Sequence, residues 1–562
     1  MLQPFKERTR AHESRAAIER LYIAMRHLFI RGSYKPLGMS GEAMIEALTL
    51  LRPEIYGDIT DPEKVELDGL LYVMERLPKG LEECRYIRLI SREGYEDSDF
   101  IPIIPPKRRR NAYRIDEEQI FIEMTRGRSD IYDILTHLTF LYIEAEKIRK
   151  NSENQRGQKN REWQLLEQIV EKEARGEDYN LDVAYTCLST LLGRTYGETV
   201  QAFRRFEKSP DVNSIFHIAY WMGRLSTEEA NEKNDREISF SSALRQRVGL
   251  HFYGEQWAHR IKQALAEANL LERPIHIISA NPHSVMNCLY AKSALASEDS
   301  LEDVARQLSL ESSSTLRRKV QQYALENGMI QLDDTTGTNI SVQIFDTTRI
   351  NTADLPDKMN CNPAYLEQEK PVILVMDYAF GEQAYETMDE LLKPYETPTD
   401  RILMNIASIS IMGKAGILEG EKGDIMLPCA HVFEGTADNY PLENDLTALD
   451  FENQGVKVFS GPMITVLGTS LQNKDILTYF LRSSWKAIGL EMEGAHYQKA
   501  IQAASKIRNS ISPDISLHYA YYASDNPLIT GNTLASGSLG VDGVKPTYVI
   551  TVAILNKILA RS

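Results

Sequence analysis

The sequence predicts an α/β protein in which an all-α first half is followed by an α/β domain. The chain has 562 residues, whereas one compact domain typically holds about 100–200 residues. Up to about residue 270, apolar residues recur with the spacing of amphipathic helices. After Arg273 they form short continuous runs that end in turn residues and alternate with helical patterns. We therefore predict a helical domain of unassigned function at residues 1–270 and an α/β domain at residues 271–562.

Helical spacing is clearest in residues 16–31, where Ile18, Leu21 and Met25 lie on one stripe that ends before Gly32. Further stretches with this spacing lie at 131–148, 163–174, 181–206 and 247–271. The polar stretch 151–161 contains no large apolar residue. It predicts an exposed loop or an internal linker.

Short apolar runs in the second half have the length of buried strands. They lie at 275–279, 340–345, 371–377, 402–412, 424–428, 461–467, 487–490 and 515–523. Such runs between helical patterns predict a sheet that is buried on both faces. At residues 298–330 two helical patterns interrupt them, one with Val304 and Leu308 and one with Leu316 and Val320. Their spacing resembles a helix-turn-helix, but we predict a helical insertion here, with DNA binding as the alternative.

The charge balance argues against a protein built to coat nucleic acid or an anionic membrane. Sixty-four Lys and Arg residues stand against 80 Asp and Glu residues, a formal net charge of −16. Both kinds of surface attract an excess of cations. The dense basic run Lys107, Arg108, Arg109 and Arg110 follows two prolines, and we expect it to be a solvated loop. We expect no membrane partner, and a nucleic acid is disfavoured.

The cysteines and histidines favour an intracellular protein without a bound metal. The five cysteines form no CxxC pair, so neither a disulfide framework nor a zinc site is predicted. His137 and His217 lie within apolar helical patterns, where a packed histidine is more frequent than a ligand. The first residues lack an apolar signal segment, and no apolar stretch approaches the ~18–20 residues that span a bilayer. We expect a cytoplasmic protein with no cofactor and no metal.

Residues suited to chemistry gather at the ends of the predicted strands, where ligands bind in open α/β folds. The first strand ends near His283. A later strand runs into residues 413–416, Gly-Lys-Ala-Gly, and another carries residues 491–494, Glu-Met-Glu-Gly. The last strand delivers Ser524 and Asp525 to its end. Each piece is common by itself, and their order along the chain is what makes the set informative.

This ordered set resembles the nucleoside phosphorylase and nucleosidase superfamily, which cleaves the N-glycosidic bond of nucleosides. The similarity rests on residues 413–416, 423–424, 491–494 and 524–525, and it spans roughly residues 273–562. Residues 524–528 are most similar to AMP nucleosidases, which also carry an extra N-terminal domain. The resemblance implies a three-layer α/β/α domain with a mixed sheet, an AMP-like purine nucleoside or nucleotide as substrate, and a homo-oligomer.

The resemblance also implies roles for three residues. The ribose passes through an oxocarbenium-like state, and the purine leaves poorly unless it receives a proton. Asp525, at the end of an apolar strand, would donate that proton because poor solvation raises its pKa. Glu493 would accept hydrogen bonds from both ribose hydroxyls, and Met492 would pack beside the sugar. The structural alternatives are a turn cap for Asp525 and a helix N-terminal carboxylate for Glu493.

The remaining site candidates would bind the base or an anion. They are Ser524, Gly413, Lys414, Gly416 and Leu471. The two glycines would let the backbone approach the sugar or an oxyanion, or they would serve the turn alone. Lys414 is the nearest cation for a phosphate, and Leu471 stands near the place where the family commonly has an aromatic residue.

Departures from the family favour water over phosphate as the attacking group. Its phosphorylases bind phosphate with two arginines, whose places are taken here by Ser284 and Ile411, and neither makes a charge-assisted contact. The hydrolases activate water with a first-loop glutamate that is missing here, which leaves His283 and Glu382 as candidates. We predict hydrolysis that releases the base and ribose or ribose phosphate. Phosphorolysis and a non-catalytic nucleotide sensor with a degenerate site are the alternatives.

Overall fold

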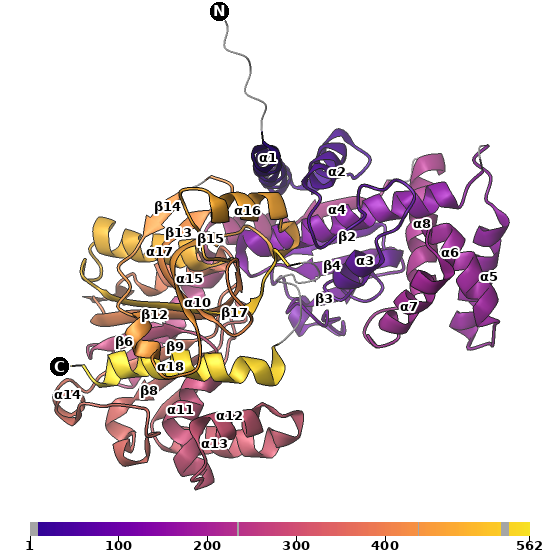
Figure 1. Cartoon of the computed structure of the whole chain (residues 1–562). Coiled ribbons are helices and arrows are strands. Elements are labelled where there is room, and N and C mark those ends of the chain that lie inside the picture. Colours follow the sequence, from indigo (N-terminus) through magenta and orange to yellow (C-terminus); the bar gives the residue numbers. More distant parts are fainter. Residues whose placement is uncertain (1–8, 155, 233–234, 437, 530–538, 562) are drawn as a thin grey trace, which may run out of the picture. The chain divides into compact units, whose positions relative to one another are not determined.

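The computed structural model describes residues 9–154, 156–232, 235–436, 438–529 and 539–561 (Figure 1). The chain divides into two compact units. The first comprises Met1–Leu250 together with Ser470–Ile476, and the second comprises His251–Thr469 together with Leu477–Ser562. Each unit has its own sheet, and the two are described separately.

The first unit contains a five-stranded sheet with the strand order β1-β5-β2-β4-β3. The strands are β1 (Ser33–Tyr34), β2 (Tyr86–Ile90), β3 (Ala112–Arg114), β4 (Gln119–Glu123) and β5 (Glu237–Phe240). β2 runs parallel to β4 and β5, and the two outer strands are antiparallel to their neighbours. The prediction of an all-α first half is therefore wrong. These strands are too short to show a period of their own, and long helices separate them in the sequence.

The helices of the first unit include those predicted at residues 16–31, 131–148, 163–174 and 181–206, together with others that the sequence did not predict. They are α1 (Arg10–Arg31), α2 (Met39–Leu51), α3 (Leu67–Met74), α4 (Gly127–Asn151), α5 (Arg161–Arg175), α6 (Leu181–Leu192), α7 (Tyr196–Phe206), α8 (Ile215–Glu232) and α9 (Ser242–Gly249). The stretch 181–206 is two helices because Gly193, at φ 63°, ends α6 in the left-handed conformation. Residues 152–154 and 156–160 lie between α4 and α5 and belong to the first unit.

The basic run at 107–110 is partly buried, so the expectation of a solvated loop is wrong for two of its residues. Arg110 is 2% exposed. Its Nε donates to Asp130 Oδ1 at 3.0 Å, and its Nη2 donates to Asp133 Oδ2 at 2.5 Å. Arg108 binds both oxygens of Asp133, at 2.9 and 3.1 Å. The two carboxylates on α4 therefore hold this segment by charge-assisted hydrogen bonds.

His137 lies one helical turn beyond Asp133 and is fully buried. Burial lowers the pKa of His137 to about 3, and the positive charges of Arg108 and Arg110 reinforce the shift against the opposing effect of Asp133. The imidazole is therefore neutral near neutral pH. It packs in the core of the first unit.

The second unit contains a ten-stranded mixed sheet with the order β14-β13-β15-β16-β12-β6-β9-β8-β7, in which β17 pairs with β12 and β13. Its main strands are β6 (Ile275–Ser279), β7 (Met329–Leu332), β8 (Val342–Asp346), β9 (Val372–Met376), β12 (Ile406–Ile417), β13 (Ile425–Phe433), β14 (Asn439–Pro441), β15 (Val458–Thr465), β16 (Gly489–Glu491) and β17 (Ser516–Asp525). Each apolar run that predicted a strand overlaps one of them.

Five of these strands close into a ring. β17 is parallel to β12 and antiparallel to β13, β13 is parallel to β15, β15 is parallel to β16, and β16 is antiparallel to the end of β12. A ring of this kind leaves its members without free edges. It also brings the ends of β12, β16 and β17 together.

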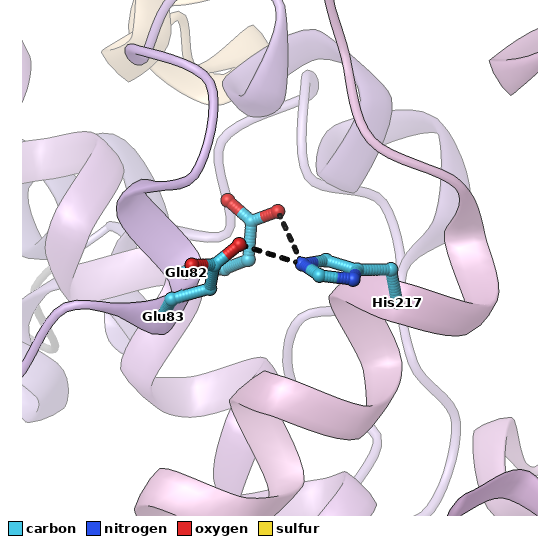
Figure 2. A group of neighbouring side chains, drawn as sticks. All are labelled: Glu82, Glu83 and His217. Atoms are coloured by element: carbon cyan, nitrogen blue, oxygen red, sulfur yellow. Dashed lines mark hydrogen bonds and ion pairs between the residues drawn. The ribbon is translucent and has the colours of Figure 1, made fainter. Parts of the chain in front are cut away.

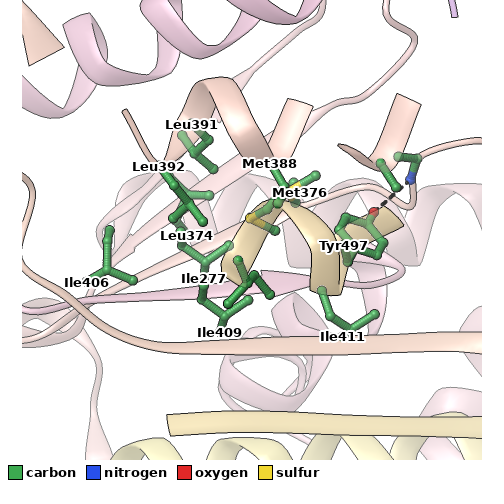
Figure 3. Close-up of a cluster of buried hydrophobic side chains, with 14 of the residues drawn as sticks. Ile277, Leu374, Met376, Met388, Leu391, Leu392, Ile406, Ile409, Ile411 and Tyr497 are labelled. Atoms are coloured by element: carbon green, nitrogen blue, oxygen red, sulfur yellow. Dashed lines mark hydrogen bonds between the residues drawn. The ribbon is translucent and has the colours of Figure 1, made fainter. Parts of the chain in front are cut away.

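Helices cover both faces of this sheet. They are α10 (Phe252–Glu267), α11 (Pro282–Leu295), α12 (Leu301–Ser309), α13 (Ser314–Glu326), α14 (Pro363–Glu369), α15 (Gln383–Leu391), α17 (Gly494–Gln502) and α18 (Val544–Leu559). A further helix, α16 (Lys474–Arg482), begins in the segment Ser470–Ile476 that is part of the first unit. Alternate residues of β9 face two separate cores, Leu374 on one side and Val375 on the other. The first core packs on α10, α15 and α17, and Figure 3 shows Ile277, Leu374 and Tyr497 within it. The second core packs on α11, α12, α13 and α18.

Among the helices that the structure describes, each is too short or too polar to cross a bilayer.

We predict that Arg110→Ala strongly destabilises the first unit. The substitution leaves Asp130 and Asp133 buried with part of their charge unpaired, which typically costs about 3–5 kcal/mol. Urea unfolding followed by circular dichroism measures the effect. Lys107→Ala, at an exposed position of the same segment, is the matched control and should change the stability by less than about 0.5 kcal/mol. Equal midpoints for the two variants would contradict the prediction.

Candidate functional site

The candidate site lies where two strands approach each other along one edge of β12. β6 pairs with β12 from Ile406 to Ile411, and β16 pairs with it at Gly416 and Ile417. Between these contacts, residues 412–415 pair only with β17 among the described strands. The loops that follow β6, β9 and β16 meet at this interval. Crevices at such interruptions of strand order are common ligand sites in α/β sheets.

Asp525 lies at the end of β17, opposite Gly416 of β12. The residue is 4% exposed. Its Oδ1 accepts a hydrogen bond from the Ser524 hydroxyl at 2.6 Å. Its Oδ2 is buried and has no hydrogen-bond partner within the described ranges of the chain. Burial raises the pKa of Asp525, and the Ser524 hydrogen bond and the charge of Lys414 only partly oppose the shift.

Glu493 lies in the turn between β16 and α17 and is 8% exposed. Its Oε1 accepts the Gly381 N–H at 3.0 Å, and its Oε2 accepts the N–H of Met492 at 3.2 Å. Gly381 belongs to the turn after β9 and has φ 54°. The carboxylate therefore joins two of the loops that meet beside β12. A carboxylate has about four acceptor positions, and those of Glu493 face the loops after β9 and β16.

Glu491 fixes the backbone of this turn. Its Oε2 accepts the N–H groups of Glu493 and Gly494, and its Oε1 accepts the Thr465 hydroxyl at 2.5 Å. Thr465 Oγ1 also accepts the N–H of Ala495 at 3.0 Å. These contacts satisfy the otherwise unpaired N–H groups at the start of α17. Although burial raises the pKa of Glu491, hydrogen bonding and the nearby His431 lower it below its ordinary value, which keeps the carboxylate charged.

His431 of β13 stands against the first turn of α17. Its Nδ1 lies 3.4 Å from Glu491 Oε1, and the side chain is fully buried. A Cβ added at Gly494 would lie 2.2 Å from His431 Nδ1 and 2.8 Å from Glu491 Oε1. Gly494 is therefore required for this close approach, because a larger residue displaces the imidazole or the helix.

Gly413 and Gly416 lie within β12. Gly413 faces Tyr521 of β17, and a Cβ added to it would lie 2.7 Å from the ring of Tyr378. The close approach that this glycine permits is thus made by a tyrosine of the same chain. Gly416 is paired on both edges of β12, with Leu490 on one side and Asp525 on the other. At Gly416, the strand that leads to Glu493 (β16) and the strand that ends at Asp525 (β17) therefore lie on opposite edges of β12.

The distance between the backbones of β16 and β17 at this position follows from the strand register. Since neighbouring strands lie about 4.8 Å apart, the backbones at Leu490 and Asp525 are separated by about 10 Å. Glu493 lies beyond Leu490 in the turn into α17. This spacing is comparable to the length of a nucleoside. The convergence of Asp525 and Glu493 on one ligand stays a prediction.

The other sequence candidates divide into two groups. Met492 is buried next to Glu493, and the exposed Lys414 lies close enough to lower the pKa of Asp525. Ser524 Oγ also lies 3.1 Å from Ala415 O, which is a second possible acceptor for its one hydroxyl proton. These three residues lie at the ends of β12, β16 and β17. Leu471 belongs to η7 (Thr469–Leu471), in the segment Ser470–Ile476 that is part of the first unit.

The two candidates for water activation follow β6 and β9. His283 is exposed in the first turn of α11, and its charge interacts with that of Asp377 after β9. Glu382 follows Gly381, and its charge acts on His496 of α17. Burial lowers the pKa of His496 to about 4. The structure thus places the two candidates after the carboxyl ends of β6 and β9, which are neighbouring parallel strands.

The structure adds residues that sequence reasoning missed. Tyr497 of α17 shares a hydrogen bond with Ser279 Oγ at 2.8 Å and accepts the Ala379 N–H at 3.3 Å (Figure 3). It thereby ties the loops after β6 and β9 to α17. Tyr378 and His431 likewise contact the site from loops and strands distant in sequence. Nothing in their local sequence distinguishes them from core residues.

A separate group in the first unit consists of Glu82, Glu83 and His217 (Figure 2). His217 Nε2 lies 2.8 Å from Glu83 Oε1 and 3.8 Å from Glu82 Oε1. Arg114 also pairs with Glu83, at 3.1 Å, and Asn213 Nδ2 donates to Glu82 Oε1 at 2.7 Å. The histidine is thus an ion-pair partner of η1 (Leu81–Glu83). His217 Nε2, Glu82 Oε1 and both oxygens of Glu83 thus have partners, whereas Glu82 Oε2 is buried without one among the described residues.

The chain belongs to the family of unknown function DUF6909, whose model matches residues 42–322 and 304–560. A comparison with curated proteins found no match.

Solved nucleosidases resemble about half of the chain. The 5'-methylthioadenosine/S-adenosyl homocysteine nucleosidase of Campylobacter jejuni is 10% identical, covers 51% of this chain and 98% of its own, and has a TM-score of 0.31. A putative methylthioadenosine nucleosidase of Weissella paramesenteroides is 11% identical over 51% and 100%, with a TM-score of 0.30. The futalosine hydrolase of Helicobacter pylori is 12% identical over 51% and 97%, with a TM-score of 0.29. Likenesses this distant carry no argument about activity.

We predict that Gly494→Ala destabilises the second unit by about 1–3 kcal/mol, because the added methyl group overlaps His431 and Glu491. Thermal unfolding measures the shift. Gly197→Ala in α7 is the matched control, since nothing lies within 4 Å of the added Cβ there. That control should be neutral or stabilising by up to about 1 kcal/mol. An unchanged midpoint for Gly494→Ala would rule out the close packing described.

Proposed function

We propose that the second unit hydrolyses the N-glycosidic bond of a purine nucleoside or nucleotide. The observation that carries the proposal is the buried carboxyl of Asp525, one oxygen of which is held by Ser524 while the other has no partner among the described residues. A carboxyl with a raised pKa and a free oxygen is suited to donate a proton.

In the proposed reaction, the bond between C1′ and the purine nitrogen breaks and its electron pair passes to the base. Asp525 gives its proton to a ring nitrogen of the departing base. A water oxygen forms the new bond to C1′, and the proton that this water loses passes to His283, Glu382 or solvent. The products are the free base and ribose or ribose phosphate, and Asp525 regains a proton from solvent before the next turnover.

Glu493 is proposed to bind the ribose diol, with Met492 beside the sugar. Its two oxygens accept the N–H groups of Gly381 and Met492, and these contacts orient the carboxylate. Glu491 is proposed as a positioning residue, because its hydrogen bonds to the N–H groups of Glu493 and Gly494 set the turn.

Hydrolysis is favoured over phosphorolysis by the residues at the family's phosphate positions. Ser284 is buried and donates to Asn281 O at 2.9 Å, and Ile411 is fully buried in the sheet. Neither position offers a cation to an attacking phosphate. Lys414, which is exposed beside the site, is proposed to bind a 5′-phosphate, so an AMP-like nucleotide is the first substrate to test. A homo-oligomer and a cytoplasmic location accompany this proposal as what the family resemblance and the cysteines imply.

We predict that the purified chain releases free base from AMP or a related purine compound, and that Asp525→Asn lowers the rate by about 100- to 10,000-fold. The asparagine keeps the shape of the side chain but cannot donate the proton. Chromatography against AMP, adenosine, inosine and methylthioadenosine, with and without phosphate, measures base release. The control is Asp514→Asn, at an exposed position of the same unit, which should leave the rate unchanged.

The other outcomes of this screen identify a different function or a different catalytic acid. Turnover that requires added phosphate identifies a phosphorylase. A thermal shift with AMP but no base release identifies a nucleotide sensor, since ligand binding alone stabilises the folded state. Full activity in Asp525→Asn excludes this residue as the acid.

The pH dependence follows from the raised pKa of Asp525. Its acid form, which donates the proton, predominates below the pKa and is lost as the pH rises through it. We therefore predict that kcat/KM is highest on the acidic side and falls with rising pH, with the midpoint above the ordinary value for aspartate. A pH–rate profile of base release tests this. The residual activity of Asp525→Asn should not show the fall of kcat/KM with rising pH. If the fall persists in this variant, it reports the titration of another group.

A further inference from the structure

Two helices of the second unit are arranged as a helix-turn-helix followed by a hairpin. α12 (Leu301–Ser309) and α13 (Ser314–Glu326) are joined by residues 310–313, which include the single turn η3 (Glu311–Ser313). The antiparallel pair β7 and β8 follows α13 directly. Helices joined by so short a turn are the unit with which many proteins place a second helix in the major groove of DNA.

The inner faces of these helices are packed. Val304 and Leu308 of α12, and Val320 and Ala324 of α13, lie in the same core as α11. Arg317 stabilises the turn between the two helices, because its Nη1 donates to Leu308 O at 2.8 Å and to Leu310 O at 2.6 Å. The angle between α12 and α13 is thus set by buried contacts and by one guanidinium that binds the end of α12.

The outer face of α13 is polar, exposed and positively charged. Thr315, Arg318, Lys319 and Gln322 are exposed along this face. Within the described part of the chain, neither Arg318 nor Lys319 takes part in an ion pair. Residues 314–322 contain no acidic residue, and Glu326, at the far end of the helix, accepts a hydrogen bond from Gln322 at 2.7 Å.

We propose that α13 binds duplex DNA, with its N-terminal turns in the major groove. A helix of 13 residues is about 20 Å long and fits a groove about 12 Å wide. Arg318 and Lys319 supply cations for phosphates, and Thr315 and Gln322 are side chains that hydrogen-bond base edges or the backbone. The start of α13 adds N–H groups, since Ser313 makes no side-chain capping hydrogen bond there.

The proposed DNA contact is confined to α13, because the chain as a whole is negatively charged and the loop of the β7–β8 hairpin is acidic. The net charge of −16 disfavours broad coating of nucleic acid, but it does not act against a helix whose outer face is locally positive. The loop after β7 carries Asp333 and Asp334, and the Asp334 carboxylate accepts the N–H groups of Thr336, Gly337 and Asn339. The proposal therefore assigns no DNA contact to this acidic loop.

The test uses the full chain and a fluorescein-labelled DNA duplex of random sequence, about three helical turns long. Fluorescence anisotropy gives the dissociation constant at several salt concentrations between about 50 and 200 mM. We expect binding that weakens with salt. The double variant Arg318→Ala/Lys319→Ala should bind at least about tenfold more weakly and reduce the slope of log K against log salt by about 1.8, corresponding to two lost phosphate contacts.

The matched control removes two exposed cations elsewhere in the same unit, in Arg401→Ala/Lys506→Ala. It should bind like the unaltered chain, and equal melting temperatures should show that all three proteins are folded. The proposal is overturned if the unaltered chain does not bind the duplex at the lowest salt, or if both double variants weaken binding equally. Equally tight binding of an RNA duplex also overturns it, because the major groove of A-form RNA is too narrow for a helix.

Discussion

The ring formed by β12, β17, β13, β15 and β16 is the constraint on which the candidate site depends. β12 is paired on one edge with β17 and on the other with β6 and then β16. Closure through β13 and β15 holds β16 and β17 in register, so that Leu490 and Asp525 face the same glycine, Gly416. Because β6 and β16 do not meet, the loops after β6, β9 and β16 fill the interval, and hydrogen bonds of Glu493 and Tyr497 join them.

The sequence allowed the second sheet to be predicted because its strands are buried on both faces. A continuous apolar run such as that of β9 is visible without knowledge of its neighbours. The strands of the first unit lack this property: β2 alternates exposed and buried residues over only five positions. The burial of Arg108 and Arg110 was not predicted for a related reason. Their partners Asp130 and Asp133 lie 20 to 25 residues further along the chain, beyond β3 and β4, and become neighbours only in the fold.

The candidate site was predictable where its residues stand in the chain order of a known family and unpredictable where tertiary contacts decide. Asp525 and Glu493 lie next to strand ends and carry recognisable local patterns. Tyr378, His431 and Tyr497 do not, because an aromatic residue in an apolar run is ordinarily part of a core. Gly494 shows the same limit, since the need for a glycine there arises from His431, which lies 63 positions away in sequence and packs against the first turn of α17.

Two buried carboxyl groups of this chain differ in how the free-energy cost of burying a charge is met. In the first unit, Asp133 is fully paired with two arginines, and its pKa is held well below the ordinary value despite burial. In the second unit, Asp525 has one neutral hydrogen-bond donor and the more distant charge of Lys414, so its pKa is raised. A paired carboxylate is fixed as an anion and serves stability. A carboxyl whose pKa is raised holds a proton that it can exchange with a ligand more readily than an ordinary aspartate does. An unsatisfied buried oxygen also costs free energy unless something binds it. That contrast is the physical reason for which we propose the chemistry at the end of β17 rather than among the buried charges of the first unit.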